Sequence, residues 1–264
     1  MKLDTDKMIA EKKNGVGWMT FNNPARRNAT SLEMWQAIGV IMSDFAKDPS
    51  IKCCVMKGAG DKAFVSGADI SQFKEKRSDA EAAAQYDRIS EEARRGLMNF
   101  QKPLIAMIRG YCLGGGLGVA MNADFRIASE DSQFGIPAAR LGIAYTFENI
   151  KRLVGLVGPS YAKEILITAR RLSAAEAYKI GLINRVVPVD KLEETVAEYT
   201  DAITANAPLS MKASKLIIAE ILKDKDERDY KMIEGLKREC FDSNDYKEGR
   251  EAFMEKRKPV FTGT

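Results

Sequence analysis

Histidine is absent from this chain of 264 residues. Its absence excludes Ser-His-Asp and Cys-His catalysis and histidine metal sites, and it removes the commonest general base near neutral pH. Acid–base chemistry must then come from carboxylates, tyrosine, lysine, cysteine or a bound water. The four cysteines include an adjacent pair and lack metal-ligand spacing. We therefore expect core cysteines in a reducing cytoplasm, without disulfides and without a metal site.

Long apolar runs and a strong charge of one sign are also lacking. No segment approaches the roughly 20 apolar residues that span a bilayer, and the first residues show no signal-peptide core. Lys and Arg number 41 against 37 Asp and Glu, which is too even a balance to indicate nucleic-acid binding. We expect neither a membrane nor a nucleic acid as a partner.

Hydrophobic periodicity predicts alternating strands and helices over the first two thirds of the chain. A hairpin is predicted around Asn14-Gly15. Ser31 is the predicted N-cap of a helix, and Ser173 with Glu176 forms a predicted capping box. Further strands are predicted at 51–57, 103–108, 124–128 and 182–187, and helices at 79–98, 147–157 and 159–168.

Beyond residue 190 the pattern is only helical. The predicted helices cover about 190–205, 209–222, 227–241 and 245–257. Strand–helix alternation followed by helices alone indicates an α/β core with a helical C-terminal part.

Three consecutive glycines, Gly114 to Gly116, lie between the predicted strand 103–108 and an apolar helix that starts at Leu117. A backbone without Cβ atoms can approach a ligand closely, and the first amides of a helix have no intrahelical partner. The arrangement suits a phosphate, a carboxylate or the oxyanion of a polarised carbonyl. A tight strand-to-helix turn is the alternative interpretation.

A second small-residue loop, 63–70, follows the predicted strand 51–57 and contains Ser66, Gly67, Ala68 and Asp69. It can also offer backbone amides to a ligand. Two such loops, each after a strand, could direct two amides at one oxygen atom.

Together with further segments, these loops resemble the crotonase (enoyl-CoA hydratase/isomerase) superfamily. The matching segments cover nearly the whole chain: 22–24, 28–29, 64–70, 102–116, 133–135, 141–142, 173–177, 181–183 and 248–257. The resemblance implies an α/β fold in which 1–204 form a spiral of ββα units that binds acyl-CoA. It implies that 205–264 form a helical oligomerisation region, and that the protein is a homotrimer or a dimer of trimers.

The resemblance also implies an oxyanion hole for an acyl-CoA thioester, formed by the amides of Ala68 and Gly115. The substrate-binding residues that it implies are Arg26, Lys62, Gly67, Ala68, Asp69, Ile70, Ser71, Gly114 and Gly115. Arg26 and Lys62 lie where relatives bind CoA phosphates, although both could be solvated surface charges. Asp69 could alternatively cap the helix that follows it. Coenzyme A is part of the substrate, and no separate cofactor is implied.

Hydratases of this family carry two catalytic glutamates, at positions that are Gly118 and Ala138 in this chain. Because two carboxylates hold and activate the added water, we do not expect ordinary hydratase activity. Tyr145 and Glu148 remain as candidate catalytic residues. A phenol can donate a proton, and a carboxylate in the first turn of a helix is stabilised by the helix dipole.

The segment Gly142-Ile-Ala-Tyr145 resembles methylmalonyl-CoA decarboxylase, a superfamily member whose reaction needs no base. That relative has a histidine where this chain has Ala68. The favoured hypothesis is an enzyme that passes through an enolate-like anion of an acyl-CoA, with an unusual acid–base set. The alternatives are a decarboxylase-like activity and a non-catalytic acyl-CoA-binding paralogue. An RNA-binding member is disfavoured by the charge balance.

Overall fold

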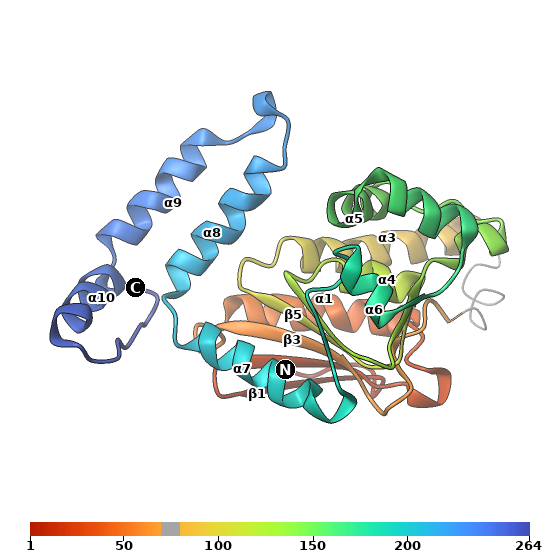
Figure 1. The fold of residues 1–264 in the computed structure, drawn as a ribbon, viewed down its shortest axis with the longest axis horizontal. Coiled ribbons are helices and arrows are strands. Elements are labelled where there is room, and N and C mark those ends of the chain that lie inside the picture. The colour runs from red at the N-terminus through yellow and green to blue at the C-terminus, as the bar shows by residue number, and fades with distance from the viewer. Residues whose placement is uncertain (70–79) are drawn as a thin grey trace.

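A computed structural model describes residues 1–69 and 80–264. Two β-sheets and their helices form the core, and α8 (Pro208–Ile221), α9 (Tyr230–Asp242) and α10 (Asn244–Glu255) extend to one side of it (Figure 1). We call residues 208–264 the C-terminal arm. No helix in the described part of the chain combines the length and apolarity needed to cross a membrane.

The larger sheet has six strands in the order β1-β2-β3-β5-β7-β10. They are β1 (Met8–Lys13), β2 (Val16–Phe21), β3 (Cys53–Gly58), β5 (Leu104–Ile108), β7 (Phe125–Ser129) and β10 (Arg185–Val187). The β1–β2 hairpin is antiparallel, as the Asn14-Gly15 turn predicts, and the remaining pairs are parallel. Helices cover both faces of the inner strands, which explains their almost continuous apolar sequences.

A second sheet of four short strands, in the order β4-β6-β8-β9, was not predicted from the sequence. It contains β4 (Ala63–Val65), β6 (Tyr111–Leu113), β8 (Gln133–Gly135) and β9 (Leu172–Ser173). Two expectations are corrected. The first part of the loop 63–70 is a strand, and the glycines follow β6 rather than the strand 104–108.

The two sheets follow a repeated pattern in which a strand of the large sheet is followed by a strand of the small one. β3 leads to β4, β5 to β6, and β7 to β8. Because β4, β6 and β8 are parallel neighbours, the segments after their C-terminal ends lie beside one another. The repeat thus brings together the loop at 66–69, the glycines at 114–116, and Pro137 with Ala138.

The other helices are α1 (Leu32–Lys47), α3 (Ala80–Met98), α4 (Gly115–Ala120), α5 (Phe147–Thr168), α6 (Ala174–Lys179) and α7 (Leu192–Thr204). The capping box is confirmed, since Ser173 Oγ accepts from the Glu176 N–H at 3.2 Å and Glu176 Oε2 accepts from the Ser173 N–H at 2.8 Å. Ser31 precedes α1 as predicted, but its hydroxyl makes no capping bond. The two helices predicted at 147–168 form one element with a break at Gly158.

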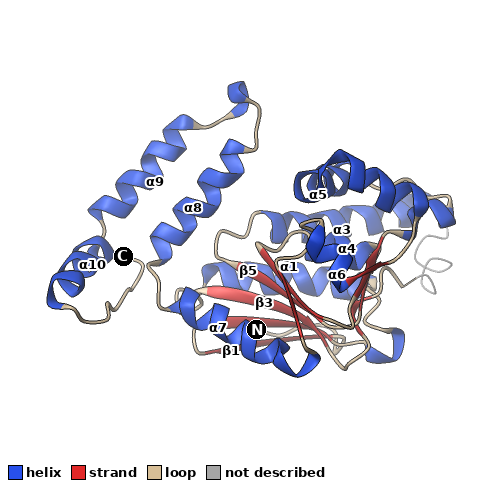
Figure 2. Ribbon diagram, viewed as in Figure 1, coloured by secondary structure: helices blue, strands red, loops and turns tan. Residues whose placement is uncertain are grey.

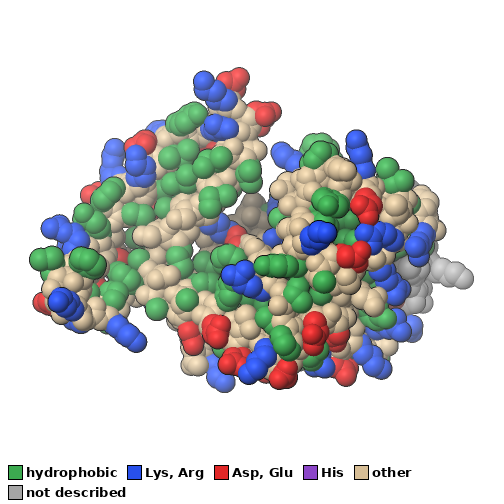
Figure 3. Space-filling view, in the orientation of Figure 1, with side chains coloured by type: hydrophobic (Ala, Val, Ile, Leu, Met, Phe, Trp, Pro, Cys, Tyr) green, Lys and Arg blue, Asp and Glu red, His purple; other side chains and the backbone are tan. Residues whose placement is uncertain are grey.

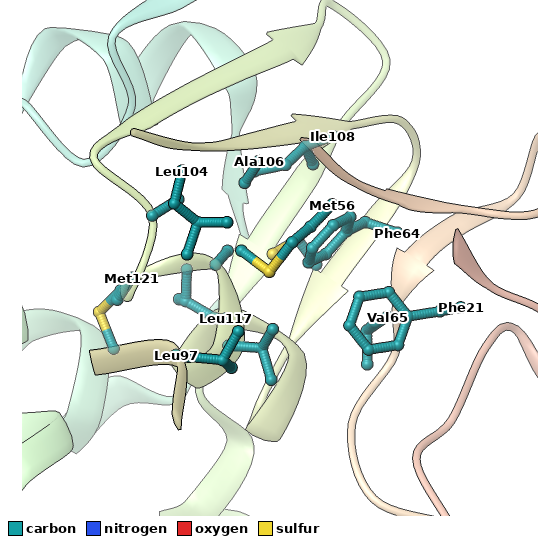
Figure 4. Close-up of a cluster of buried hydrophobic side chains, with 14 of the residues drawn as sticks. Phe21, Met56, Phe64, Val65, Leu97, Leu104, Ala106, Ile108, Leu117 and Met121 are labelled. Carbon is teal, nitrogen blue, oxygen red and sulfur yellow. The ribbon is translucent and has the colours of Figure 1, made fainter. Parts of the chain in front are cut away.

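The main hydrophobic core lies between the large sheet and the helices α1, α3 and α4. Figure 4 shows side chains from β3, β4, β5, α3 and α4 meeting there, including Met56, Phe64 and Leu117. A smaller cluster on the opposite face packs α7 against the sheet (Figure 2). Adjacent strand residues point to opposite faces, so Cys54 lies in the main core and Cys53 in the smaller cluster.

Polar anchors join the C-terminal arm to the core. Lys215 of α8 pairs with Asp124 at 2.8 Å. Lys52 Nζ donates to the carbonyl oxygens of Thr204, at 2.9 Å, and Phe261, at 3.0 Å. The segment around Phe261 therefore returns to the start of β3, beside the end of α7.

Candidate active site

The first candidate amide is held in place by a short bridge to Thr30. The Thr30 N–H donates to the Gly67 carbonyl at 2.8 Å, and the Asp69 N–H donates to the Thr30 carbonyl at 2.9 Å. Because both neighbours of Ala68 face Thr30, the Ala68 N–H faces away from it. It donates to no acceptor within residues 1–69 and 80–264.

The second candidate amide begins α4. Gly114 adopts φ 51° and donates its N–H to the Gly135 carbonyl, at the end of β8, at 2.8 Å. Gly115 is the first helical residue, and its N–H has no acceptor in the described part of the chain. Gly116 must lack a side chain, since a Cβ atom there would lie 2.0 Å from the Val65 carbonyl oxygen. The start of α4 is thus pressed directly against β4.

The two loops meet at these amides. A Cβ atom on Gly115 would lie 3.8 Å from the Ala68 nitrogen and 3.9 Å from the Gly67 carbonyl carbon. Two unpaired N–H groups in such proximity can donate to one oxygen atom, as in an oxyanion hole. The structure therefore brings together Gly67, Ala68, Gly114 and Gly115, which the sequence analysis singled out.

Tyr145 reaches the same place from the turn before α5. Its hydroxyl donates to the Gly114 carbonyl at 3.1 Å. That carbonyl and the Gly115 N–H belong to one peptide group, so the hydrogen bond from Tyr145 orients this peptide and polarises its N–H.

Burial raises the pKa of Tyr145, the Cys112 thiol acts in the same direction, and the positive charge of Arg94 acts against both. The phenol therefore stays protonated at neutral pH. Tyr145 is a hydrogen-bond donor in this site and is not suited to act as a base.

Asn149 is a site residue that the sequence analysis missed. A Cβ atom on Gly118 would lie 2.9 Å from Tyr145 Oη, 3.4 Å from Asn149 Nδ2 and 3.5 Å from Asn149 Oδ1. The side chains of Tyr145 and Asn149 thus fill the space in front of Gly118. Asn149 shares the buried face of α5 with Leu153 and Val157, and a polar residue in that apolar stripe is the signal that could have revealed it.

Glu148 and Ala138 lie outside the group formed by the two candidate amides, Tyr145 and Asn149. Glu148 is exposed in the first turn of α5. Burial lowers the pKa of Arg152, and the negative charge of Glu148 partly opposes that shift. Within the described residues, Glu148 makes no hydrogen bond to either candidate amide. Ala138 lies in the 3-10 helix η3 (Pro137–Leu141) and packs, half-buried, against the main core.

The two predicted phosphate contacts lie at opposite ends of β4. Arg26 ends the 3-10 helix η1 (Pro24–Arg26), and its carbonyl accepts from Ser66 Oγ at 3.4 Å. Lys62 precedes β4, and its carbonyl accepts from the Tyr111 N–H at 3.0 Å. Both side chains are exposed. Ile70 and Ser71 lie outside the described residues, as does the helix that Asp69 was suggested to cap.

Two further cations lie near Lys62 and were not predicted. The guanidinium of Arg27 lies 5.3 Å from the centre of the Tyr111 ring, and that of Arg171 lies 5.2 Å from it. Both positive charges are thus held beside Tyr111, the residue whose N–H donates to the Lys62 carbonyl. Within residues 1–69 and 80–264, no group of His, Cys, Asp and Glu side chains could hold a metal ion.

The whole chain is similar to known acyl-CoA enzymes. It is 34% identical over 256 residues to the short-chain-enoyl-CoA hydratase of Clostridium acetobutylicum, covering 97% of both chains. It is 31% identical over 253 residues to the methylmalonyl-CoA decarboxylase of Escherichia coli, covering 95% of both. The crystal structure of an enoyl-CoA hydratase/carnithine racemase from Magnetospirillum magneticum superposes with a TM-score of 0.93 at 34% identity, covering 99% of this chain and 97% of that one.

The family comparison agrees with these relatives. Residues 11–264 match the enoyl-CoA hydratase/isomerase family. The α/β fold expected from the resemblance is confirmed by the match to solved structures of this family. The chain therefore belongs to the enoyl-CoA hydratase/isomerase family of the crotonase superfamily.

Proposed function

We propose that this protein is an enzyme that binds an acyl-CoA thioester and stabilises an enolate-like anion between the amides of Ala68 and Gly115. The main support for the proposal is that these two N–H groups lie close together at the start of α4 and that neither has an acceptor among the described residues. In acyl-transfer sites of this kind, loss of one donor costs about 2.7–4 kcal/mol of transition-state stabilisation. The two amides supply the electrostatic part of catalysis.

The acid–base part of the proposal rests on Tyr145. Its phenol is protonated, and its hydroxyl donates to the peptide that carries the Gly115 amide. By resemblance, hydratases place glutamates at Gly118 and Ala138, and neither residue here can activate a water. Glu148 is a second candidate acid or base. Its side chain is exposed in the first turn of α5, and it would have to extend from there to the acyl group.

The CoA moiety is proposed to contact the residues around β4. Gly67, Ala68 and Asp69 would contact it through the loop after β4, as would Ile70 and Ser71 beyond the described part. The exposed side chains of Arg26 and Lys62 are available to phosphate groups. Because CoA belongs to the substrate, the proposal includes no separate cofactor.

A second candidate is decarboxylation of a malonyl-type thioester, and the Tyr145 geometry favours it. The bond between the α-carbon and its carboxylate breaks, CO₂ leaves, and the electron pair enters the thioester as an enolate. The α-carbon then takes a proton, supplied by the Tyr145 phenol and returned to it from water. No base is needed, which suits a site that contains the protonated phenol of Tyr145.

We further propose that residues 205–264 form an oligomerisation region, which builds a homotrimer or a dimer of trimers. Large apolar side chains are exposed along the C-terminal arm, among them Leu222, Phe253 and Met254, with exposed fractions of 76%, 83% and 81% (Figure 3). A mostly apolar cavity of about 740 Å³ separates α8 from the core. Such surfaces mark protein contacts. Light scattering on the purified chain would give the assembly mass. The proposal places the enzyme in the cytoplasm.

The proposal is tested by incubating the pure protein with crotonyl, 3-enoyl, methylmalonyl and ring-bearing CoA thioesters in deuterated water. Gain of water, loss of CO₂ or incorporation of one deuterium, read by mass spectrometry, identifies the reaction class. Turnover of any of these thioesters supports an enzyme. If every thioester is bound but returned unchanged, the protein is a non-catalytic acyl-CoA-binding paralogue. If none is bound, the proposed site is wrong.

A further inference from the structure

The side chain of Asn149 is buried, and it makes no hydrogen bond to the part of the chain that the structure describes. Only 7% of the residue is exposed, and its amide has no partner within residues 1–69 and 80–264. The side-chain nitrogen and oxygen of Asn149 nevertheless both keep some contact with solvent. Burying an unpaired amide is unfavourable. An amide kept in this state is available to a ligand.

The position of Asn149 relative to the two candidate amides is set by α4. Gly115 and Gly118 are three residues apart, so they lie on one face of the helix, roughly 5–6 Å apart at the Cβ positions. The Gly115 position faces Ala68, and the Gly118 position faces Tyr145 and Asn149. A thioester whose carbonyl oxygen is held by Ala68 and Gly115 would therefore direct a substituent of its α-carbon toward Asn149.

We infer that Asn149 recognises the acyl group and that its side-chain N–H donates to a carboxylate on the α-carbon next to the thioester. This inference rests on the function proposed above, and it assigns the substrate class as malonyl-type thioesters. Among the described residues, the polar atoms nearest to the Gly118 position are those of the Asn149 amide and the Tyr145 hydroxyl, all within 3.5 Å of a single point. The Asn149 nitrogen is the free donor there, because the Tyr145 proton is donated to the Gly114 carbonyl.

One positive charge, that of Arg94, acts on the Tyr145 side of this position. Arg94 of α3 stacks on Trp35, with the guanidinium 5.3 Å from the ring centre, and donates to Ser90 Oγ at 2.8 Å. The positive charge of Arg94 acts on Tyr145 and partly opposes the rise of its pKa. Hydrogen bonds that involve a charged partner are about twice as strong as neutral ones, so a carboxylate beside Tyr145 and Asn149 is bound more tightly than an uncharged oxygen.

The test compares two ligands that differ in one group. Methylmalonyl-CoA carries a carboxylate where isobutyryl-CoA carries a methyl group. Dissociation constants are measured by calorimetry for the wild type, Asn149→Asp and Asn149→Leu, and each recovered ligand is checked by mass. Where a ligand is consumed, kcat/KM replaces the dissociation constant. Asn149→Asp keeps the shape and places a carboxylate in the first turn of α5, where the helix dipole stabilises it.

The wild type should bind methylmalonyl-CoA more tightly than isobutyryl-CoA. Both variants should lose about tenfold or more in affinity for methylmalonyl-CoA, and about twofold or less for isobutyryl-CoA. Lys151→Gln, at an exposed position of the same helix, should change neither value. Circular dichroism confirms that each variant is folded.

Equal losses for both thioesters, or no loss for either, would overturn the role of Asn149. A parallel comparison of 3-hydroxybutyryl-CoA with butyryl-CoA covers the neutral alternative. If Asn149→Leu affects only the hydroxyl-bearing ligand, the assignment to a carboxylate is wrong. If the wild type binds no thioester, the proposed function fails together with the inference. If it binds isobutyryl-CoA and the variants show no discrimination, only the inference fails.

Discussion

The hydroxyl oxygen of Tyr145 lies 2.9 Å from the point that a Cβ atom on Gly118 would occupy. A side chain at position 118 would therefore displace the Tyr145 hydroxyl that donates to Gly114. The donor to the Gly114–Gly115 peptide is present because α4 carries a glycine one turn later. The two residues form one structural unit and should be tested as a pair.

Gly118→Ala should destabilise the wild type but not a Tyr145→Phe background. In the wild type the added methyl group displaces the hydroxyl, which costs about 1–3 kcal/mol and exceeds the gain of up to about 1 kcal/mol from replacing a helical glycine. Without the hydroxyl, the nearest atom among the described residues outside α4 is Asn149 Nδ2 at 3.4 Å, and the helical gain should dominate. Urea denaturation of the four proteins measures the coupling. Equal effects of Gly118→Ala in both backgrounds would disprove it.

The pH dependence of stability should report the buried phenol of Tyr145. Burial raises its pKa above the ordinary value of 10.0, so the folded state keeps a proton that the unfolded chain loses. The associated stability is fully present below the unfolded pKa and declines as the pH rises through it toward the folded value. Between about pH 9 and pH 11, the wild type should lose more free energy of unfolding than Tyr145→Phe. Parallel denaturation curves across that range would contradict the buried, protonated phenol.

Gly115→Ala should abolish most turnover while leaving the fold intact. Among the described residues outside α4, no atom lies closer than 3.8 Å to the added methyl group, but the methyl group stands beside the two amides proposed to bind the oxyanion. We expect kcat to fall by about 10²–10³-fold, as for loss of one oxyanion donor. The measurement is turnover of whichever thioester the panel identifies, together with the melting temperature. A variant as active as the wild type would place the oxyanion elsewhere.

Gly116→Ala is the matched control, and it should behave in the opposite way. Its methyl group would lie 2.0 Å from the Val65 carbonyl oxygen, so α4 has to move away from β4. We expect a large loss of melting temperature or of soluble protein, because overpacking of this kind costs about 1–3 kcal/mol or more. Comparing Gly115→Ala with Gly116→Ala thus distinguishes a loss of turnover from a loss of stability.

Much of the large sheet and of the helices could be predicted from sequence, because their hydrophobic periods are long and regular. The small sheet could not be predicted. Strands of two or three residues, such as Ala63–Val65 and Tyr111–Leu113, are too short to show a period, and they form because β3 and β5 deliver them side by side. Their effect on the site is large, since the ends of β4 and β6 position both candidate amides.

In the site too, residues with a local sequence signal could be predicted, and a residue placed there by tertiary contacts could not. Ala68 and Gly115 were found through their small-residue loops and the family resemblance, and the structure brings those loops together. Asn149 was not found. Its place in the apolar stripe of α5 marks it as unusual, but only the tertiary contact of α5 with Gly118 shows that it faces the candidate site. Glu148, its neighbour in sequence, was chosen instead because a charged residue is the more obvious candidate.

Ala138→Glu should create or increase hydration of crotonyl-CoA. The residue is half-buried directly after β8, beside the ends of β4 and β6, and a glutamate there would supply one carboxylate to activate water. Ala139→Glu, on the exposed side of the same 3-10 helix, is the control and should have no effect. Rates are followed by loss of the enoyl absorbance. No gain in a folded Ala138→Glu variant would show that the acyl group lies away from η3.

Asp245→Asn should loosen the C-terminal arm from the core. Asp245 is 3% exposed, and its carboxylate accepts from the N–H groups of Thr262, at 2.7 Å, and Gly263, at 2.9 Å. These bonds hold the segment that includes Phe261, whose carbonyl accepts from Lys52. An amide places a donor against one of these N–H groups and leaves it unpaired. We expect the free energy of unfolding to fall by about 1–3 kcal/mol.

Asp242→Asn provides the comparison for this prediction, because Asp242 is exposed at the end of α9. Its substitution should change the free energy of unfolding by about 0.5 kcal/mol or less. Chemical denaturation gives both values, and light scattering shows whether the assembly mass changes with them. If Asp245→Asn lowers the assembly mass but leaves turnover per chain unchanged, the C-terminal arm contributes to association of the subunits and not to catalysis. If the two aspartates behave alike, the C-terminal segment does not hold the arm, and the anchors at Lys215 and Asp124 suffice.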